Sequence, residues 1–351
     1  MSVKIIGTGS FIPEHITTNE DFLHHSFLNS DGSAFEVKND VIIEKFKSIT
    51  GIEERRYAKD HHKASDLAFF AAEIAIQDAK IDPETLDYII VGHNFGDVKS
   101  GQLQSDMLPA LAARVKQNLG IKKPSCVAYD VIFGCPGWVE GMIQAKAFIK
   151  AGMAKRCLVI GAETLSRVVD SNDRDSMIFA DGAGAAIVER SDNAEGVLSH
   201  ESATYTQDET YYIYSGKSYH HSASSKQYIK MHGRKVYEFA LSHVPKAMKT
   251  CFDASGKSIN DLKKIFIHQA NEKMDEAIVK RFYRLFREPV PKDILPMSIQ
   301  KLGNSSVATV PTLYDMVLKN QYPEHTLEKG DVIMFASVGA GMNINAITYQ
   351  L

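Results

Sequence analysis

The stretch SCVAYDVIFGCPGWVEGMIQAKAFIKAGMAKRCLVIGA, residues 125–162, decides the fold class of this chain. An apolar run at Ser125–Phe133 is followed by a helical pattern at Pro136–Gly152 and by a second strand-like run at 155–162. Strands that alternate with helical patterns are typical of βαβ units and of sheets with parallel strands. We therefore predict an α/β architecture.

A faint internal repeat extends this prediction to the whole chain. The strand-like segments LDYIIVGHNF (86–95) and LKKIFIHQAN (262–271) begin 176 residues apart. The segments KRCLVIGA (155–162) and GDVIMFAS (330–337) begin 175 residues apart, and both offsets are close to half of the 351 residues. A βαβ-type unit that occurs twice explains them. We expect two similar halves, 1–192 and 193–351.

One cysteine stands at a place suited to chemistry. Cys135 lies in FGCPGW (133–138), at the turn between strand and helix, with Pro136 expected at the first helical position. The partial positive charge of a helix N-terminus favours a thiolate over a thiol. Such a cysteine suits nucleophilic attack on a carbonyl or thioester. A packed, inert thiol is the alternative.

Two later segments add an imidazole and an amide. His268 ends the strand-like run of IFIHQAN (265–271), and Asn304 lies in LGNSSVATVP (302–311) at a helix entrance. A core histidine and a helix N-cap are the plainer interpretations of these two residues. Together with Cys135 they form a plausible Cys/His/Asn site, in which each residue lies at the end of a strand or the start of a helix.

These segments resemble the signatures of the β-ketoacyl-[acyl-carrier-protein] synthase III family, within the thiolase superfamily. Members carry Cys-Ala/Ser-Gly-Phe, His-Gln-Ala-Asn and Gly-Asn-Thr-Ser-Ala at these places. Further matching pieces keep the family order: GTGSFIPE (7–14), TGIEERR (50–56), DR (173–174), DGAGA (181–185) and GAG (339–341). The resemblance covers essentially the whole chain. It implies a duplicated thiolase-like fold, with two βαβ-type halves in five layers, αβαβα.

The resemblance also implies roles for the three residues. Cys135 would hold an acyl group as a thioester. His268 and Asn304 would donate hydrogen bonds to a malonyl thioester carbonyl and stabilise the enolate left by loss of CO₂. The backbone N–H groups of Cys135 and Ala340 would form the oxyanion hole for the acyl group, where a plain turn at Gly339–Gly341 is the alternative.

Substrate and carrier contacts are implied by the same resemblance. The residues expected to make them are Asn271, Lys273, Arg174, Leu108, Trp138 and Gly233. No cofactor is expected, because the substrates are carried on the phosphopantetheine of CoA or acyl carrier protein. The family further implies a homodimer, with the run Ser125–Phe133 suited to pairing across a two-fold axis.

The implied activity is a decarboxylative Claisen condensation in fatty-acid initiation or related lipid biosynthesis. Several positions depart from the family. The tryptophan expected against the CoA adenine is absent, Ile49 fills an arginine position, and Leu108 stands where a gating phenylalanine is common. A specialised ketosynthase of polyketide, alkylresorcinol or pyrone type, with a longer or carrier-bound acyl donor, is therefore the alternative. The irregular segments 27–40 and 206–231 are either binding loops or variable surface loops.

Composition excludes several other classes. The net charge of −3 and pI near 6.5 give no support to nucleic-acid binding. We expect no membrane span and no signal peptide, and the four dispersed cysteines favour a reduced, cytoplasmic setting. The histidine pairs at 24–25, 61–62 and 220–221 lack a third ligand at metal spacing, so no metal site is expected.

A papain-like cysteine protease is a remote alternative. That class also orders Cys, His and Asn, with the histidine about 130–150 residues after the cysteine. Here the gap between Cys135 and His268 is 133 residues. However, Cys-Gly-Ser-Cys-Trp is absent and Asn304 is followed by Ser-Ser. A protease would not explain the internal repeat either.

Overall fold

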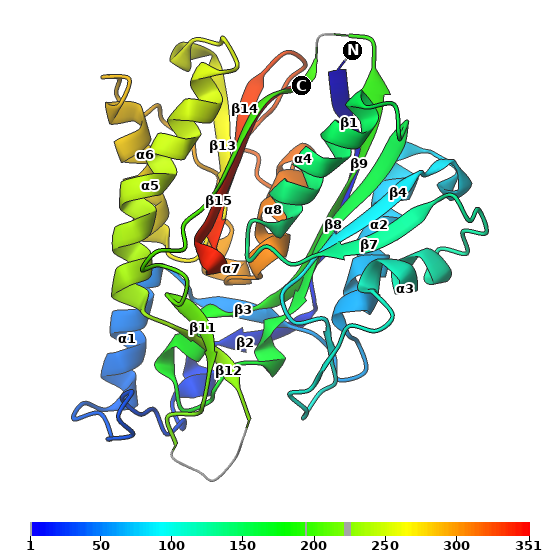
Figure 1. The fold of residues 1–351 in the computed structure, drawn as a ribbon. Coiled ribbons are helices and arrows are strands. Elements are labelled where there is room, and N and C mark those ends of the chain that lie inside the picture. Colours follow the sequence, from blue (N-terminus) through cyan, green and yellow to red (C-terminus); the bar gives the residue numbers. More distant parts are fainter. Residues whose placement is uncertain (1, 194, 221–225) are drawn as a thin grey trace.

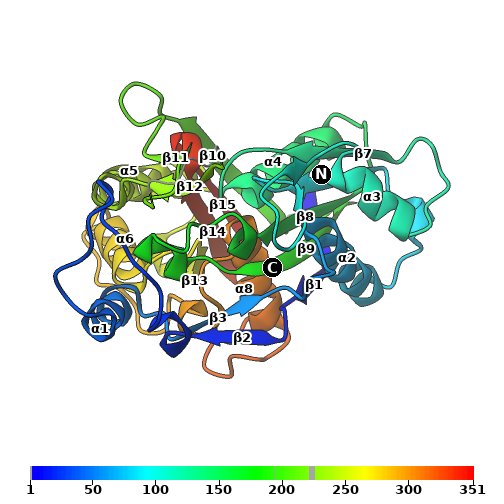
Figure 2. The same cartoon turned by 90° about the horizontal axis from the view of Figure 1, so that it is seen from below.

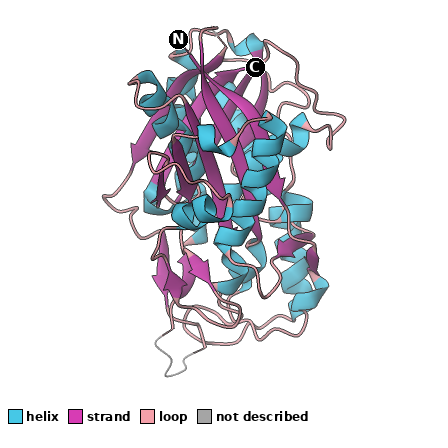
Figure 3. Cartoon of the chain, turned by 90° about the vertical axis from the view of Figure 1, so that its right-hand side faces the viewer, coloured by secondary structure: helices cyan, strands magenta, loops and turns pink. Residues whose placement is uncertain are grey.

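A computed structural model describes residues 2–193, 195–220 and 226–351 (Figure 1). His221 and residues 222–225 of the polar segment 206–231 lie outside these described residues, as does Ala194 near the expected division of the chain. Helices and sheets alternate across the molecule from α5 and α6 on one side to α2 and α3 on the other. Both termini lie at the same end (Figures 1 and 3).

The first sheet has five strands. Their order is β1 (Ser2–Phe11), β9 (Asp181–Ser191), β8 (Arg156–Thr164), β4 (Tyr88–Gly92) and β7 (Val127–Val131). Strand β4 runs parallel to both β8 and β7, whereas β9 is antiparallel to β1 and β8. The quoted stretch forms β7, the helix α4 (Gly137–Lys150) and β8, so its predicted pattern is confirmed. Pro136 is the N-cap residue of α4, one position before the expected one.

The second sheet repeats this topology with four strands. Their order is β10 (Gly196–Thr204), β15 (Asn343–Gln350), β14 (Val332–Gly339) and β13 (Leu262–Ile267). Strands β13 and β14 are parallel, and β15 is antiparallel to both of its neighbours. Thus β4 and β8 of the first sheet correspond to β13 and β14, as the sequence repeat predicts. The duplicated fold is confirmed, while the division at 192–193, between β9 and β10, stays a prediction.

Helices cover both faces of each sheet. Helices α4 and α8 (Thr309–Leu318) lie between the two sheets (Figure 1). Helices α2 (Ala64–Ala79) and α3 (Leu111–Asn118) cover the outer face of the first sheet, and α5 (Gly233–Asp253) and α6 (Glu272–Arg284) that of the second. The result is the expected five-layer αβαβα arrangement.

Three buried clusters explain these layers. Side chains alternate between the faces of a strand, so Ile90 of β4 packs in the central cluster and its neighbours Ile89 and Val91 pack under α2. In the second sheet, Phe335 faces the centre and Met334 packs under α5 and α6. Because both faces are covered, these strands are continuous apolar runs.

Smaller elements gather in the half opposite the termini (Figure 1), and Figure 2 views the molecule from that end. They are α1 (Asn39–Thr50), α7 (Ile299–Leu302) and the hairpins β2–β3 (His15–Thr18, Glu54–Tyr57) and β11–β12 (Ile213–Gly216, Tyr228–Met231). The short pair β5–β6 (Asp97–Val98, Ser105–Asp106) follows β4. Single 3₁₀ turns lie at Glu20–Phe22, Pro83–Thr85, Leu165–Arg167, Arg174–Ile178, Ile259–Asp261, Ser306–Ala308 and Ala340–Met342.

Candidate active site

A cavity of about 1170 Å³ opens at the carboxyl ends of the parallel strands. Segments that directly follow β4, β7, β13 and β14 all line it. Ligands of α/β sheets generally bind at these strand ends. The outer wall comes from α1, the segment 27–40 and the β11–β12 hairpin, which contribute Phe35, Val41, Phe46, Tyr214 and Ile229 among others. Both irregular segments therefore form part of this wall.

The three predicted residues line this one cavity. Cys135 lies in the turn between β7 and α4, and His268 follows the end of β13. Asn304 follows α7 and pairs through its backbone with Phe179. The fold thus brings together residues from both sequence halves. Their catalytic roles stay predictions.

Two glycines let the loops of this site touch through their backbones. A Cβ atom on Gly134 would lie 2.7 Å from the Ala340 nitrogen, and one on Gly339 would lie 2.5 Å from the Cys135 nitrogen. Side chains at these positions would separate the two loops. Asn343 supports the contact, because its Nδ2 donates to the carbonyl oxygens of Ala340 and Phe133. The backbone N–H groups of Cys135 and Ala340 therefore lie at one junction.

Two opposing influences act on the acidity of the Cys135 thiol. The helix N-terminus makes the thiol more acidic, and burial makes it less acidic. Burial raises the pKa of Cys135 to about 12, the negative charge of Glu163 acts in the same direction, and a hydrogen bond from Ser306 opposes both. Burial is the larger influence here, since the charged form loses its hydration. The expected thiolate is therefore corrected to a neutral thiol.

His268 is a neutral imidazole. Burial lowers the pKa of His268 to about 4, and a backbone hydrogen bond with Ser306 opposes this shift. Its side chain is almost fully buried, and its Nδ1 atom has no hydrogen-bond partner among the described residues. A neutral imidazole can donate one hydrogen bond and accept one.

The amide of Asn304 is fixed by its own loop. The N–H of Ser306 donates to Asn304 Oδ1 over 2.8 Å. Its backbone is held on both sides, because its N–H donates to the Ile178 carbonyl and its carbonyl accepts from Ala180. The amide oxygen is thereby engaged within the protein, which leaves the NH₂ group to donate to a ligand. The bond from the Ser306 N–H is of the kind that an Asn makes at a helix entrance, here the 3₁₀ turn Ser306–Ala308 that leads into α8, so the two interpretations of Asn304 are compatible.

Three of the expected binding residues line the cavity. They are Asn271, Arg174 and Gly233. Asn271 is the N-cap of α6, and its Oδ1 accepts from the Met274 N–H. The guanidinium of Arg174 lies over the Phe35 ring at 5.2 Å. Gly233 is the first residue of α5. These positions suit contacts with an extended ligand that reaches toward Cys135.

The other three do not line this cavity, which corrects the assignment of Trp138 and leaves those of Leu108 and Lys273 as predictions. Trp138 is buried in the central layer, where its indole meets Phe335 edge-on, because α4 presents position 138 to the space between the sheets. Leu108 is 90% exposed on the loop after β6 and does not line this cavity. Lys273 is exposed on the solvent side of α6, whose cavity and core positions include Met274.

Sequence reasoning missed two polar residues beside the cysteine. Ser306 lies two residues beyond Asn304, and Asn94 lies two residues beyond the end of β4. Both side chains belong to a hydrogen-bonded group that reaches Cys135 Sγ. The position of Asn94 just after a buried strand was a usable signal, since the carboxyl ends of parallel strands meet at the same edge of a sheet.

Within the described residues, no three His, Cys, Asp or Glu side chains are grouped as ligands of an ion. None of the helices described is both long enough and apolar enough to span a bilayer.

Two related sheets around a central helix pair, with a cysteine over the N-terminus of one of these helices, define a thiolase-like condensing enzyme. Comparison with known proteins agrees. The profile of 3-oxoacyl-[acyl-carrier-protein] synthase III matches residues 129–206, and the profile of its C-terminal part matches residues 252–351. The chain is 33% identical to "Beta-ketoacyl-[acyl-carrier-protein] synthase III" of Caldanaerobacter subterraneus, over 97% of this chain and 96% of the relative.

Solved structures give the same result. The 3-oxoacyl-[acyl-carrier-protein] synthase III of Aquifex aeolicus superposes with a TM-score of 0.81 and 28% identity, covering 100% of both chains. The β-ketoacyl-[acyl-carrier-protein] synthase III of Thermus thermophilus does so with a TM-score of 0.81 and 28% identity over 99% of both chains. The chain belongs to the β-ketoacyl-[acyl-carrier-protein] synthase III family, whose members are acyltransferases.

Proposed function

We propose that this enzyme joins an acyl group held on Cys135 to a malonyl-type unit carried by acyl carrier protein. The observation that supports this proposal is the convergence of Cys135, His268 and Asn304 on one deep cavity. The family membership supports the carrier protein as partner. Incubation with acyl thioesters and then with malonyl-acyl carrier protein, followed by intact-mass spectrometry and CO₂ measurement, tests both half-reactions.

The first half-reaction transfers the acyl group. The Cys135 sulfur attacks the thioester carbonyl of the donor and forms a new C–S bond. The donor C–S bond breaks, and the departing thiol takes the proton that the Cys135 thiol gives up. The N–H groups of Cys135 and Ala340 would stabilise the negative oxygen formed on the way. Their close approach through Gly134 and Gly339 supports this assignment.

The second half-reaction forms the carbon–carbon bond. The malonyl carboxylate leaves as CO₂, and its bonding electrons pass into an enolate. His268 and the Asn304 NH₂ group would donate hydrogen bonds to the enolate oxygen. The enolate carbon then attacks the acyl carbonyl on Cys135, the C–S bond breaks and the sulfur is released as a thiolate. A neutral His268 suits the donor role, because its protonation state does not change above about pH 5.

The carrier arm would enter past Asn271, Arg174 and Gly233. All three lie on the cavity wall, and Arg174 supplies a positive charge for a phosphate. Exposed Lys273, next to this entrance, suits contact with an acidic carrier protein. We place the enzyme in the cytoplasm, where its thioester substrates are carried.

A medium or long acyl primer is the expected donor. The cavity exceeds the roughly 300–1,000 Å³ of ordinary ligand pockets. Apolar side chains of α1 and the 27–40 segment line it, including Val37, Val41 and Ile49. Each buried methylene favours binding by about 0.8 kcal/mol. The rate of Cys135 acylation should therefore rise with chain length and then fall, when measured over a series from acetyl to dodecanoyl thioesters.

The same series separates the two candidate pathways. A maximum at acetyl-CoA, with octanoyl donors inert, would contradict a long primer and favour ordinary fatty-acid initiation. Acyl groups of the same length, presented once on CoA and once on carrier protein, serve as the matched comparison. A preference for the carrier-bound donor would favour a specialised ketosynthase, in agreement with the missing tryptophan and with Ile49 in an arginine position.

We also expect a homodimer formed along β7. This strand is the edge of the first sheet, and edge strands readily pair with a second chain. Val127 and Ile132 are exposed there, as are Met107 and Leu108 on the nearby loop. Light scattering at micromolar concentration should give twice the 38.9 kDa mass of the chain.

A charged residue at the proposed interface provides the control. Ile132→Glu should shift the enzyme toward the monomer, whereas Met153→Glu, which changes an exposed methionine at another site, should not. A monomeric wild-type enzyme would overturn this proposal, and so would dimers that are unaffected by Ile132→Glu.

A further inference from the structure

A chain of hydrogen bonds approaches the Cys135 sulfur from inside the protein. The Ser306 hydroxyl lies 3.2 Å from Cys135 Sγ, and Asn94 Nδ2 lies 3.0 Å from Ser306 Oγ. The same Nδ2 atom also donates to Glu163 Oε1 over 2.5 Å. The side chains thus lie in the order Glu163, Asn94, Ser306, Cys135, and they come from four separate segments of the chain.

The number of hydrogens on Asn94 and Ser306 determines which group donates in each of these hydrogen bonds. An amide NH₂ group has two hydrogens, and Asn94 directs one to Glu163 and the other to Ser306. The Ser306 oxygen therefore acts as the acceptor toward Asn94. A hydroxyl has a single hydrogen, so that of Ser306 remains for the Cys135 sulfur.

Ser306 is held rigidly in an unusual backbone conformation. Its φ angle is +53°, a value that few residues other than glycine adopt. It opens the 3₁₀ turn Ser306–Ala308, and its N–H donates to Asn304 Oδ1. The backbone of the next residue, Val307, packs against Gly161 of β8, where a Cβ atom would lie 2.3 Å from the Val307 oxygen. The hydroxyl is therefore held in place by its loop.

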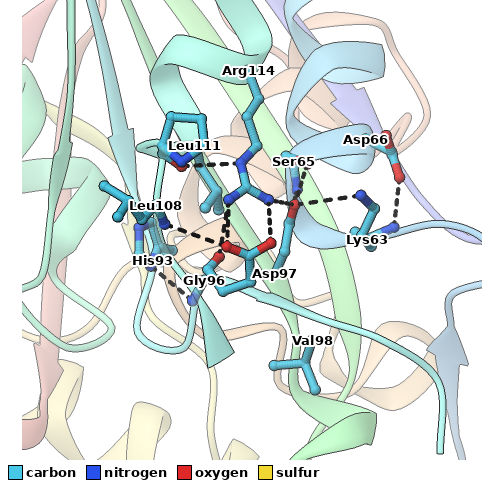
Figure 4. A network of polar contacts seen from close by, with 12 residues as sticks. Lys63, Ser65, Asp66, His93, Gly96, Asp97, Val98, Leu108, Leu111 and Arg114 are labelled. Carbon is cyan, nitrogen blue, oxygen red and sulfur yellow. Dashed lines mark hydrogen bonds and ion pairs between the residues drawn. The ribbon is translucent and has the colours of Figure 1, made fainter. Parts of the chain in front are cut away.

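Asn94 lies on a loop that is fixed equally well. On one side of it, His93 Nδ1 accepts from the Gly96 N–H over 3.1 Å. On the other side, the buried carboxylate of Asp97 accepts from Ser65 Oγ and Arg114 Nη1, each over 2.6 Å (Figure 4). The segment between these anchors has little freedom, so Asn94 is preorganised toward Ser306.

We propose that Ser306 and Asn94 are positioning residues for the nucleophile: Ser306 donates a hydrogen bond to the Cys135 sulfur, and Asn94, held by Glu163, directs that hydrogen. This inference rests on the proposed function of Cys135. The bond acts whenever the sulfur is negative, which is before attack on the donor and again when condensation releases it. Hydrogen bonds to a charged acceptor are stronger than those between neutral groups.

The acidities of the neighbouring groups agree with this arrangement. Burial raises the pKa of Glu163 to about 8, while hydrogen bonds from Asn94 oppose the shift and the nearby charge of Asp181 adds to it. Near neutral pH, Glu163 is therefore mostly uncharged, and its negative charge, which makes the Cys135 thiol less acidic, develops only as the pH rises toward 8. His268, which lines the same cavity, is also neutral.

The test uses alkylation of Cys135 by iodoacetamide, because this reaction reports on the thiol without any thioester substrate. The rate is measured from pH 6 to 9 by mass spectrometry of the peptide that contains Cys135. Ser306→Gly removes the hydroxyl and tolerates the positive φ. We expect it to slow alkylation on the order of tenfold at each pH, which corresponds to about one unit in the pKa of the thiol.

Two further variants separate positioning from a structural effect. Asn94→Ala should slow alkylation less than Ser306→Gly, and it should have no additional effect in the double variant, because Asn94 acts through Ser306. Ser305→Ala is the matched control, since this neighbouring buried hydroxyl contacts Thr309 instead of the cysteine. Thermal melting of each variant identifies any loss of folding.

Several outcomes would overturn the inference. They are an unchanged alkylation rate in Ser306→Gly, additive effects of the two substitutions, or an equal loss in Ser305→Ala. Each is independent of the proposed function, which fails instead if the wild-type enzyme forms no acyl adduct on Cys135.

Discussion

Cys135→Ala should form no covalent acyl adduct and should lose condensation by roughly 10³-fold or more, as expected when a nucleophile is removed. The sulfur lies in the cavity at the junction of two loops, where Ser306 donates to it. The alanine keeps the Cβ atom and the backbone N–H, so the loop contact with Gly339 is retained. Intact-mass spectrometry after incubation with acyl thioester measures the adduct.

A second cysteine provides the control for this experiment. Cys126 precedes β7 and is buried under the outer helices, away from the cavity. Cys126→Ala should keep both the adduct and the activity. An adduct that persists in Cys135→Ala but is lost in Cys126→Ala would show that the nucleophile is wrongly assigned.

Asn304→Ala should still be acylated on Cys135 but should lose condensation by roughly 10²–10³-fold, the usual effect of removing one donor from an oxyanion hole. The backbone of Asn304 holds the loop to Ile178 and Ala180, so the fold should persist although the Ser306 N–H loses its acceptor. His268→Ala should behave alike. Rapid-quench measurement of acyl-enzyme and of CO₂ release follows the two half-reactions separately.

The ratio of the two half-reactions is the internal control. An interaction made in one transition state affects one step. If Asn304→Ala lowers acylation and decarboxylation equally, the proposed division of roles is wrong. In the wild type, the titration of His268 should not change the rate of CO₂ release above about pH 5, because burial keeps the pKa of that imidazole near 4.

The fold and the family were predictable from short stretches of sequence. The run 125–162 became β7, α4 and β8, and the repeat of 86–95 at 262–271 became β4 and β13. These signals are local, since the spacing of apolar residues sets which face of an element is buried. Cys135, His268 and Asn304 were found in the same way, because each lies where an element begins or ends.

The failure at Trp138 concerns a contact between distant segments. Trp138 was expected at the substrate, yet it packs against Phe335, almost 200 residues further along the chain. Leu108 lies on an exposed loop, and its place at an acyl pocket stays a prediction. The outcome at Trp138 does not depend on the residues beside it in sequence. It depends on which layer of the fold packs against it.

The sequence by itself therefore determined the class of fold, the family and the identity of the candidate nucleophile. Tertiary structure alone decided the surroundings of that nucleophile. Burial makes the Cys135 thiol less acidic, although its helix N-terminus predicts the reverse. Ser306 donates to its sulfur and in turn accepts from Asn94, which lies 212 residues earlier in the chain. The physical reason is that hydration and hydrogen bonding depend on all atoms nearby in space, whereas sequence patterns describe only neighbours along the chain.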